Sequence, residues 1–414
     1  MFKKTAEIFF TLSVGVAALT GTASAQNSPG SLALDASLRG AVERKDVPGV
    51  VALVTDRDKV LYQSAFGVAD VSTGRPLTPD ALFRIASMTK AITSVALMQL
   101  IEQGRLGLDD PAEKYLPELV GLKVIESFKA TGAYQVRPAA RAPTVKHFLT
   151  HTSGLAYPFT SEIWRDLKPR AGENYPFGGP LLFDPGERWH YSTSTDVVGK
   201  LVEVVSGQKL EEYFRQHIFA PLKMDDTSYN VPETKGPRLV AQQQRGGDRM
   251  DGAVELQKPQ LGLTIAAPIG GGGLASTADD YGRFVRMLLN GGTLDGARVL
   301  KAETVALMGQ NHIGAVSVPA LKSALPRSAD FTFIADGRDK WGLGFLIIVD
   351  QVPGKRSPGS LSWGGINNTF FWIDPARGIA GVIMMQYLPF ADAKALAVYD
   401  AFERGTYQLV NAER

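Results

Sequence analysis

Cysteine is absent from this chain of 414 residues, so its fold contains no disulfide and its chemistry has no thiol nucleophile. An excess of charge of one sign is also missing, because 44 Lys and Arg residues stand against 42 Asp and Glu residues. No basic stripe with interleaved aromatic residues, the pattern typical of nucleic-acid binding, is found in the sequence. The composition therefore argues against a nucleic-acid partner, and it leaves the apolar core to stabilise the fold.

Long apolar runs are missing from the chain after residue 25. No stretch there approaches the ~20 uninterrupted apolar residues that a membrane-spanning helix needs. The first 25 residues combine a basic start at Lys3 and Lys4, a short apolar run over 8–19 and small residues at 23–25. This order is typical of a secretory signal peptide. We expect cleavage after Ala25, no transmembrane segment after cleavage, and a periplasmic or secreted protein.

Two common catalytic patterns are also absent. The sequence has no Gly-x-Ser-x-Gly, the nucleophile turn of α/β-hydrolases. Among its five histidines, only His147 and His151 have the spacing of a helical zinc pair, and no acidic residue stands between them to act as a base. We expect structural roles for both histidines, and the sequence predicts neither a metal site nor a cofactor.

Strand-like runs near both ends of the chain enclose a helix-rich middle. A helix over 32–46 precedes strands at 49–55 and 60–66, and strands at 341–349, 360–363, 369–373 and 379–385 precede a closing helix over 391–407. Helical patterns in the middle cover 144–149, 195–205 and 210–219. This order predicts an α/β fold of the α+β kind: an antiparallel sheet built from both chain ends, flanked by helices, with a mostly helical lobe inserted.

We therefore expect an α/β lobe formed by residues 26–115 and 260–414, with a helical lobe at 116–259. Residues 310–340 are broken by Pro319, Pro326 and Gly337 and form a long surface excursion. Such a segment is either a lid or binding loop or a disordered stretch. The sequence gives no indication of the oligomeric state.

Ser87-Met88-Thr89-Lys90 is the leading candidate for a catalytic motif. It opens a long apolar helical pattern, and side chains three residues apart lie on one face of a helix about 5–6 Å apart. Ser87 is thus a candidate nucleophile, with Lys90 as the group that takes its proton. A second Ser-x-x-Lys, at 206–209, follows a helical run and is expected to form a helix end at Ser206-Gly207.

A tyrosine completes the candidate cluster. Tyr191 stands out among 12 tyrosines because it lies in a hydroxyl-rich turn, Trp189 to Asp196, just before a helix. The turn residues Ser194, Thr195 or Asp196 are also typical helix caps, so a purely structural reading of the turn stays open.

Four motifs in this order resemble the serine β-lactamase-like family. They are Phe83 to Lys90 around the Ser-x-x-Lys, Leu149-Thr150-His151-Thr152-Ser153-Gly154-Leu155, Tyr191-Ser192-Thr193 and Ser362-Trp363-Gly364-Gly365. The chain is most similar to family VIII carboxylesterases, which are themselves similar to class C β-lactamases. The resemblance implies a β-lactamase/transpeptidase-like fold over nearly the whole mature chain.

The resemblance also implies roles for individual residues. Ser87 would be the acylated nucleophile, Lys90 its proton partner, and Tyr191 the general base that activates the deacylating water. The backbone N–H groups of Ser87 and Ile366 would form the oxyanion hole. Thr193, Trp363, Gly364 and Gly365 would lie at the substrate pocket.

Three departures from the family pattern matter, and the third favours esters over β-lactams. Class C β-lactamases carry Tyr-x-Asn where this chain has Thr193, and no Lys-Thr-Gly box occurs in the sequence. Trp363 stands where a cation would hold a substrate carboxylate. We therefore expect an exported serine carboxylesterase acting on small neutral esters. The alternatives are a β-lactamase, D-aminopeptidase or DD-peptidase with the same Ser-Lys-Tyr site, and a β-lactam-binding protein without turnover. The triplet Ser228-Tyr229-Asn230 also resembles a family box, but we expect it to be a structural turn.

Overall fold

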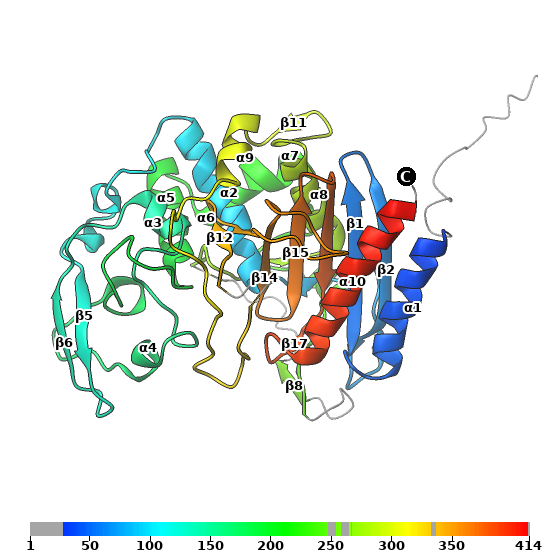
Figure 1. Cartoon of the computed structure of the whole chain (residues 1–414), viewed down its shortest axis with the longest axis horizontal. Helices are drawn as coiled ribbons and strands as arrows, with labels where there is room; N and C mark the ends of the chain where they lie inside the picture. The colour runs from blue at the N-terminus through cyan, green and yellow to red at the C-terminus, as the bar shows by residue number, and fades with distance from the viewer. Residues whose placement is uncertain (1–27, 247–253, 258–264, 266, 333–336, 413–414) are drawn as a thin grey trace, which may run out of the picture.

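Eight strands form one antiparallel sheet, to which both ends of the chain contribute (Figure 1). The computed structural model describes residues 28–246, 254–257, 265, 267–332 and 337–412, so the expected signal peptide lies outside the described residues. Along the sheet the strands are β12 (Lys340–Trp341), β13 (Leu346–Ile347), β14 (Leu361–Gly365), β15 (Thr369–Asp374), β16 (Ile379–Met384), β1 (Gly49–Asp56), β2 (Val60–Asp70) and β3 (Arg75–Pro76). The pairing of β1 with β16 joins the two ends of the chain, with Leu53 opposite Val382.

The central strands are apolar on both faces, and alternate residues enter different cores. On β15, Phe370 and Trp372 join the core beneath the terminal helices, whereas Phe371 and Ile373 join the larger core on the other face. This division follows from the period of two along a strand. A sheet covered by helices on both sides is the consequence.

Helices from opposite ends of the chain cover one face of the sheet. α1 (Pro29–Glu43) and α10 (Ala393–Ala412) lie side by side there, as Figure 1 shows, and bury residues such as Leu34 and Phe402. The other face carries α8 (Ala278–Leu289), which packs against β1, β15 and β16. The predicted α+β fold, with its antiparallel sheet built from both ends and flanked by helices, is therefore confirmed.

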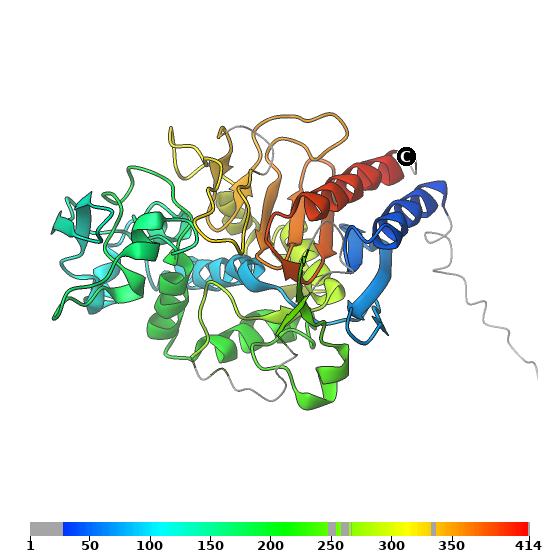
Figure 2. The same ribbon diagram turned by 90° about the horizontal axis from the view of Figure 1, so that it is seen from below.

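The helical lobe lies at the far side of α2 (Thr89–Glu102) from the terminal helices (Figure 2). The α5 helix (Ser194–Ser206) packs against both α2 and α3 (Val145–Leu149). The remaining helices of the described chain are α4 (Glu162–Asp166), α6 (Leu210–Phe214), α7 (Ala220–Leu222) and α9 (Ala302–Met308). The predicted lobe boundaries at 116 and 259 stay a prediction.

Short strands complete the described elements. β5 (Lys123–Phe128) and β6 (Tyr134–Pro138) form a hairpin inside the region predicted to be mostly helical. The other pairs are β4 (Phe83–Arg84) with β9 (Ala275–Ser276), β10 (Thr293–Leu294) with β11 (Ala297–Arg298), and β7 (Gln242–Gln244) between β8 (Val254–Gln257) and β17 (Tyr387–Leu388).

Several predicted boundaries differ from the structure: the closing helix extends to Ala412, and the helix predicted over 210–219 is α6 followed by a π-helical turn at Arg215–Phe219. Two further differences have a clear local cause. The strand expected over 341–349 is a hairpin of β12 and β13, because the chain turns at Gly344, whose φ is +97°. The first helix begins at Pro29 rather than residue 32, since Ser28 accepts a hydrogen bond from the Ser31 N–H (3.2 Å) and Pro29 suits the first helical position. It ends at Glu43, and Lys45 beyond it takes a positive φ of 58°.

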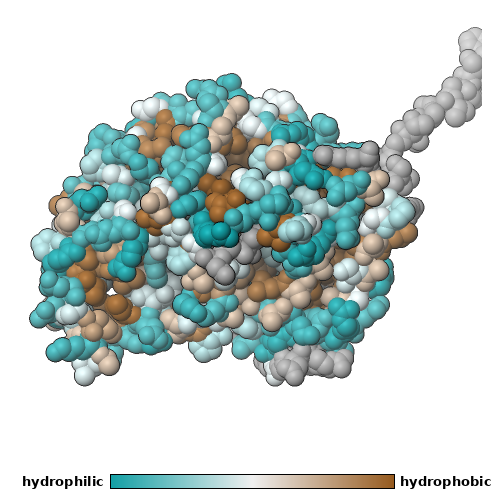
Figure 3. Space-filling model, viewed as in Figure 1, coloured by the Kyte–Doolittle hydropathy of each residue, from teal (hydrophilic) through white to brown (hydrophobic). Residues whose placement is uncertain are grey.

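The outer surface in the view of Figure 3 is mainly hydrophilic, with apolar residues gathered in separate small areas. Within the described part of the chain, no helix combines the length and apolar character that crossing a membrane requires.

Candidate active site

Ser87 lies in a tight turn that leads into α2. Residues Ala86–Met88 form a single 3₁₀ turn, and the α-helix continues from Thr89. Ala86 has a φ of +45°, a left-handed conformation that costs about 1–2 kcal/mol for a residue with a side chain. Ser87 is partly exposed, whereas Lys90 is only 2% exposed. The turn thus presents the serine hydroxyl to a pocket and keeps the lysine beneath it.

The Lys90 amine has three hydrogen-bond partners. Its Nζ lies 3.2 Å from Ser87 Oγ, 3.1 Å from Tyr157 Oη and 2.6 Å from the Gly271 carbonyl oxygen. An ammonium fills this site by donating all three of its protons. A neutral amine fills it equally well by donating to Gly271 and Tyr157 while its lone pair accepts the Ser87 proton. The geometry therefore suits both protonation states that a proton relay from Ser87 requires.

Two tyrosines flank this lysine. Lys90 Nζ lies 4.9 Å from the ring centroid of Tyr191 and 5.3 Å from that of Tyr157. Burial, together with the nearby Asp196 and Tyr191, raises the pKa of Tyr157 well above its ordinary value, so this phenol stays neutral. Among the described residues, the buried hydroxyl of Tyr191 has no hydrogen-bond partner. Its unused hydroxyl makes Tyr191 the phenol that is available to a bound water or substrate.

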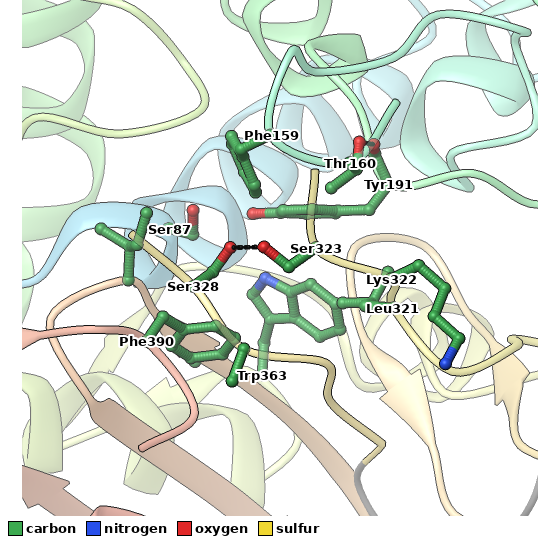
Figure 4. Close-up of a pocket in the computed structure, with 13 residues that line it drawn as sticks. Ser87, Phe159, Thr160, Tyr191, Leu321, Lys322, Ser323, Ser328, Trp363 and Phe390 are labelled. Atoms are coloured by element: carbon green, nitrogen blue, oxygen red, sulfur yellow. Dashed lines mark hydrogen bonds between the residues drawn. The ribbon is translucent and has the colours of Figure 1, made fainter. Parts of the chain in front are cut away.

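The pocket above Ser87 has largely apolar walls (Figure 4). Including open solvent at its mouth, it holds about 480 Å³ of space outside the protein atoms, within the range typical of small-molecule sites. In Figure 4 the phenol of Tyr191 extends across the pocket toward Ser87. The lining residues are Ser87, Phe159, Thr160, Tyr191, Leu321, Lys322, Ser323, Ser328, Ala329, Trp363, Gly364, Ile366 and Phe390.

Trp363 forms one wall of the pocket from β14. Its ring packs 4.9 Å from the ring of Tyr191 and 4.7 Å from that of Trp341, and only 4% of the residue is exposed. Gly364 and Ile366 follow it along the pocket edge. These contacts hold the indole in one orientation beside the candidate base.

The excursion over 310–340 supplies the opposite wall. Leu321 and Phe331 pair through two backbone hydrogen bonds of 2.7 and 2.9 Å, which close the loop at its base. The Ala324 N–H donates to the Phe159 carbonyl oxygen (2.9 Å), so the loop spans the site from the C-terminal part of the chain to the helical lobe. Of the two readings of this segment, its described residues fit a binding loop.

Two predicted pocket residues lie outside the pocket lining of the described structure. The Thr193 hydroxyl donates to the Phe177 carbonyl oxygen (3.0 Å) and so ties the N-cap residue of α5 to the turn at Phe177. Gly365 packs against the backbone before Ser87, where an added Cβ would lie 2.3 Å from the Ile85 carbonyl oxygen. Gly365 therefore permits β14 to approach the nucleophile turn closely.

The motifs that we assigned to structure do lie in structural positions. Ser206 ends α5, and Gly207 follows it with a φ of 76°, a left-handed helix end. Tyr229 donates to the Ile269 carbonyl oxygen (2.7 Å) and Asn230 donates to Glu211 (3.1 Å), so this triplet braces neighbouring loops. His147 accepts the Thr144 N–H at the start of α3 (3.0 Å). His151 Nδ1 and the Ser192 hydroxyl are 3.1 Å apart behind Tyr191.

Sequence analysis missed Tyr157 as a site residue. Tyr157 follows the predicted motif ending at Leu155 by two positions, and this proximity was the only available signal. The apolar wall residues Phe159, Leu321 and Phe390 carry no local signal, because they meet only in the folded chain.

An accessible serine hydroxyl beside a buried lysine is the arrangement of a serine hydrolase or acyltransferase. Residues 34–403 match the family described as Beta-lactamase, and the chain belongs to this family. The resemblance inferred from the four motifs is confirmed.

Relatives within this family include acyl-transferring and ester-cleaving proteins. The Acyltransferase mokF of Monascus pilosus is 30% identical over 363 residues, which cover 82% of this chain and 86% of the relative. The Lovastatin esterase of Penicillium rubens is 30% identical over 401 residues, covering 92% of this chain and 99% of the relative. The solved structure of unliganded Simvastatin Synthase (LovD) from Aspergillus terreus matches with a TM-score of 0.78 and 26% identity, over 92% of this chain and 98% of that one.

Proposed function

We propose that this chain is a carboxylesterase that cleaves small neutral esters through an acyl-enzyme on Ser87. The observation that carries the proposal is the position of Ser87 Oγ, 3.2 Å from Lys90 Nζ and open to a pocket walled by aromatic and aliphatic side chains. An uncharged acyl group gains from burial in such a pocket, whereas a carboxylate loses its hydration there. The likeness to an esterase supports the same conclusion.

The proposed reaction has two steps, and Lys90 serves the first. Neutral Lys90 takes the Ser87 proton while Oγ attacks the ester carbonyl carbon, and the backbone N–H groups of Ser87 and Ile366 stabilise the oxyanion. The carbon–oxygen bond to the alcohol then breaks, and the alcohol leaves with the proton. The product is an ester of Ser87.

Tyr191 serves the second step. Tyr191 first transfers its hydroxyl proton to neutral Lys90, and the resulting phenolate, with the Lys90 ammonium beside its ring, accepts a proton from the water that attacks the acyl carbon. The carboxylic acid is released, and the proton returns to Ser87. Water and ester are consumed in equal amounts to give acid and alcohol.

Acyl transfer is a second candidate, favoured by the likeness to an acyltransferase. The same acyl-enzyme would pass its acyl group to an alcohol instead of water. Adding increasing butanol during turnover of p-nitrophenyl butyrate and measuring butyl butyrate by gas chromatography separates the two. Ester formation that dominates over butyric acid at low butanol assigns a transferase, and butyric acid alone assigns a hydrolase.

Export is part of the proposal and rests on residues 1–25 alone. If the protein is exported, N-terminal sequencing of the protein from its native cell envelope or medium starts at Gln26. A chain recovered only from the cytoplasm with Met1 retained would contradict export, and the proposed reaction on Ser87 would be unaffected.

The test of the function compares p-nitrophenyl butyrate with nitrocefin on the wild type and Ser87→Ala. We expect ester turnover by the wild type alone and little cleavage of nitrocefin. Faster hydrolysis of nitrocefin than of the ester would assign a β-lactamase. Stable labelling by nitrocefin without turnover of either compound would assign a β-lactam-binding protein.

A further inference from the structure

Asp196 lies in the first turn of α5, five residues after Tyr191, and an acidic residue there would ordinarily be ascribed to capping the helix. Its carboxylate is directed elsewhere. Asp196 Oδ1 accepts a hydrogen bond of 2.7 Å from the backbone N–H of Gly271, which is distant in the sequence. The helix-start explanation therefore does not account for where this carboxylate points.

Gly271 links Asp196 to Lys90. The same glycine whose N–H is bound by Asp196 offers its carbonyl oxygen to Lys90 Nζ at 2.6 Å, the shortest of the three lysine contacts. An added Cβ on Gly271 would lie 2.6 Å from Asp196 Oδ1 and 3.2 Å from Lys90 Nζ. The carboxylate and the amine are thus separated by no more than those two distances together, and only glycine fits between them.

The loop that contains Gly271 is held on both sides. Thr93 of α2 donates to the Gly270 carbonyl oxygen (2.7 Å), and an added Cβ on Gly270 would lie 2.2 Å from the Thr195 carbonyl oxygen of α5. The loop is therefore packed between α2 and α5, and a change at Asp196 acts on the Gly271 carbonyl through the backbone of Gly271 itself.

Among the described titratable groups around Lys90, Asp196 is the carboxylic acid, which can carry a negative charge opposite the ammonium. A buried ammonium is costly unless an opposite charge lies nearby. The other titratable groups facing Lys90 are Tyr157, Tyr191 and His151, and burial lowers the pKa of His151 well below its usual range, so it is neutral. Burial raises the pKa of Asp196 above its ordinary value, and the charge of Lys90 and the hydrogen bond from the Gly271 N–H oppose that rise. Asp196 is the acidic group in this set.

We infer that Asp196 is a positioning residue for Lys90: it holds the N–H of Gly271 and so fixes the position of the glycine whose carbonyl oxygen receives the lysine amine, and it supplies the negative charge opposite the ammonium. Among the described residues, Asp196 is not one of those that line the pocket. It acts on the lysine and leaves substrate binding unchanged. This inference rests on the proposed function, because it describes how the proton partner of Ser87 is held.

Two substitutions separate the two contributions of Asp196. Asp196→Asn keeps an oxygen that accepts the Gly271 N–H but removes the charge, whereas Asp196→Ala removes both. We expect kcat for p-nitrophenyl butyrate to fall about 10-fold in the Asn variant, because the ammonium that stabilises the Tyr191 phenolate in the second step loses its counter-charge, and about 100-fold in the Ala variant, which also loses the Gly271 contact, with KM little changed.

The pH profile of kcat/KM distinguishes this role from a purely structural one, because a purely structural role of Asp196 would leave the profile unchanged. Without the carboxylate, the Lys90 ammonium releases its proton more readily, so the acidic limb of the kcat/KM profile moves to lower pH in Asp196→Asn. Asp196→Glu retains the charge and is expected to keep the acidic limb near that of the wild type.

A matched control is Asp280→Asn. Asp280 is another buried aspartate in the first turn of a helix, and it accepts the Asp226 N–H (2.9 Å) away from Lys90. Its variant should leave the acidic limb in place. If the wild type turns over the ester and Asp196→Asn has the same kcat and the same acidic limb of the pH profile, this inference is wrong and the proposed function stands. A wild type without ester turnover would overturn the proposed function instead.

Discussion

The Lys90 amine lies 3.1 Å from the hydroxyl of Tyr157, a tyrosine outside the four motifs on which the family resemblance rests. Tyr191, the motif tyrosine, meets the same lysine through the face of its ring at 4.9 Å. The two phenols therefore hold the lysine in different ways. One anchors its amine, and the other keeps a free hydroxyl beside the substrate pocket.

Tyr157→Phe and Tyr191→Phe should lower turnover to different extents. Removing the Tyr157 hydroxyl leaves one buried N–H of Lys90 without its partner, at a cost of about 1–3 kcal/mol, so we expect kcat to fall about 10- to 100-fold. Removing the Tyr191 hydroxyl removes the proposed base, and we expect a loss of about 10²- to 10⁴-fold. Steady-state kinetics with p-nitrophenyl butyrate measures both.

Tyr62→Phe provides the control for these variants. The Tyr62 hydroxyl donates to Asp35 (2.8 Å) beneath α1, away from the pocket, so its loss should leave kcat unchanged. Near-normal turnover by Tyr191→Phe would remove Tyr191 from the mechanism.

Trp363 should make the enzyme discriminate against anionic acyl groups. The indole lies in a cluster with Tyr191 and Trp341, where a substrate carboxylate would lose hydration. The cation in the pocket lining, Lys322, is already paired with Asp330 (2.6 Å). We expect kcat/KM for p-nitrophenyl butyrate to exceed that for the mono-p-nitrophenyl ester of succinic acid by at least about 10-fold, a difference of about 1.4 kcal/mol. Equal kcat/KM values for the two esters, at both low and high salt, would show that Trp363 has no such effect.

The buried ion pair between Arg356 and Glu403 should matter to stability and not to catalysis. Arg356 Nε lies 2.7 Å from Glu403 Oε1, and each side chain is 1% exposed, between the sheet and α10. Arg356→Met leaves the Glu403 carboxylate buried, with Lys355 Nζ at 3.7 Å as its remaining cation. We expect a loss of about 3–5 kcal/mol in the free energy of unfolding, measured in urea.

The double variant Arg356→Met with Glu403→Leu tests the cause of that loss. It removes both charges, and we expect it to recover most of the unfolding free energy. Equal instability of the single and double variants would assign the loss to packing against Trp372 rather than to the unpaired charge.

His190 should make the fold less stable in acid. Burial, with a smaller contribution from Arg188, lowers the pKa of His190 from 6.5 to about 4. Between these values the unfolded chain binds more protons than the folded one, so this stability is present above pH 6.5 and is lost as pH falls toward 4. His147 acts in the same direction, with a pKa of about 4. Asp280 opposes both, because burial raises its pKa to about 6.

His190→Gln isolates the contribution of one histidine. Since Asp280 and His147 act equally in both proteins, the loss of unfolding free energy between about pH 7 and about pH 5 should be smaller in the variant by about 2 kcal/mol. Urea unfolding at the two pH values measures it. Parallel losses in the two proteins would contradict this account of His190.

Local patterns predicted the parts of the molecule that local geometry determines. The spacing of Ser87 and Lys90 places both on one helix face, and the apolar runs of β15 and β16 match strands that are buried on both sides. The hairpin of β5 and β6 was missed because its strands are largely polar and lie at the surface.

The residues around Lys90 were harder to predict because they come from separate elements. Asp196 resembles an ordinary helix cap in sequence, and only the packing of α5 against the Gly271 loop directs its carboxylate toward the lysine. Thr193 shows the converse, since a hydroxyl expected at the pocket instead bonds the Phe177 carbonyl. The contact between Ala324 and Phe159, which supports the binding-loop interpretation for the described part of residues 310–340, joins segments far apart in the sequence and could not be predicted from local patterns.

The covalent intermediate on Ser87 is the central claim, and intact-mass spectrometry of acid-quenched enzyme during turnover of p-nitrophenyl butyrate tests it most directly. The account predicts that one butyryl group is added to the wild type, that peptide fragmentation maps it to Ser87, and that Ser87→Ala shows neither adduct nor turnover. A butyryl group on another residue, or full turnover by Ser87→Ala, would contradict it.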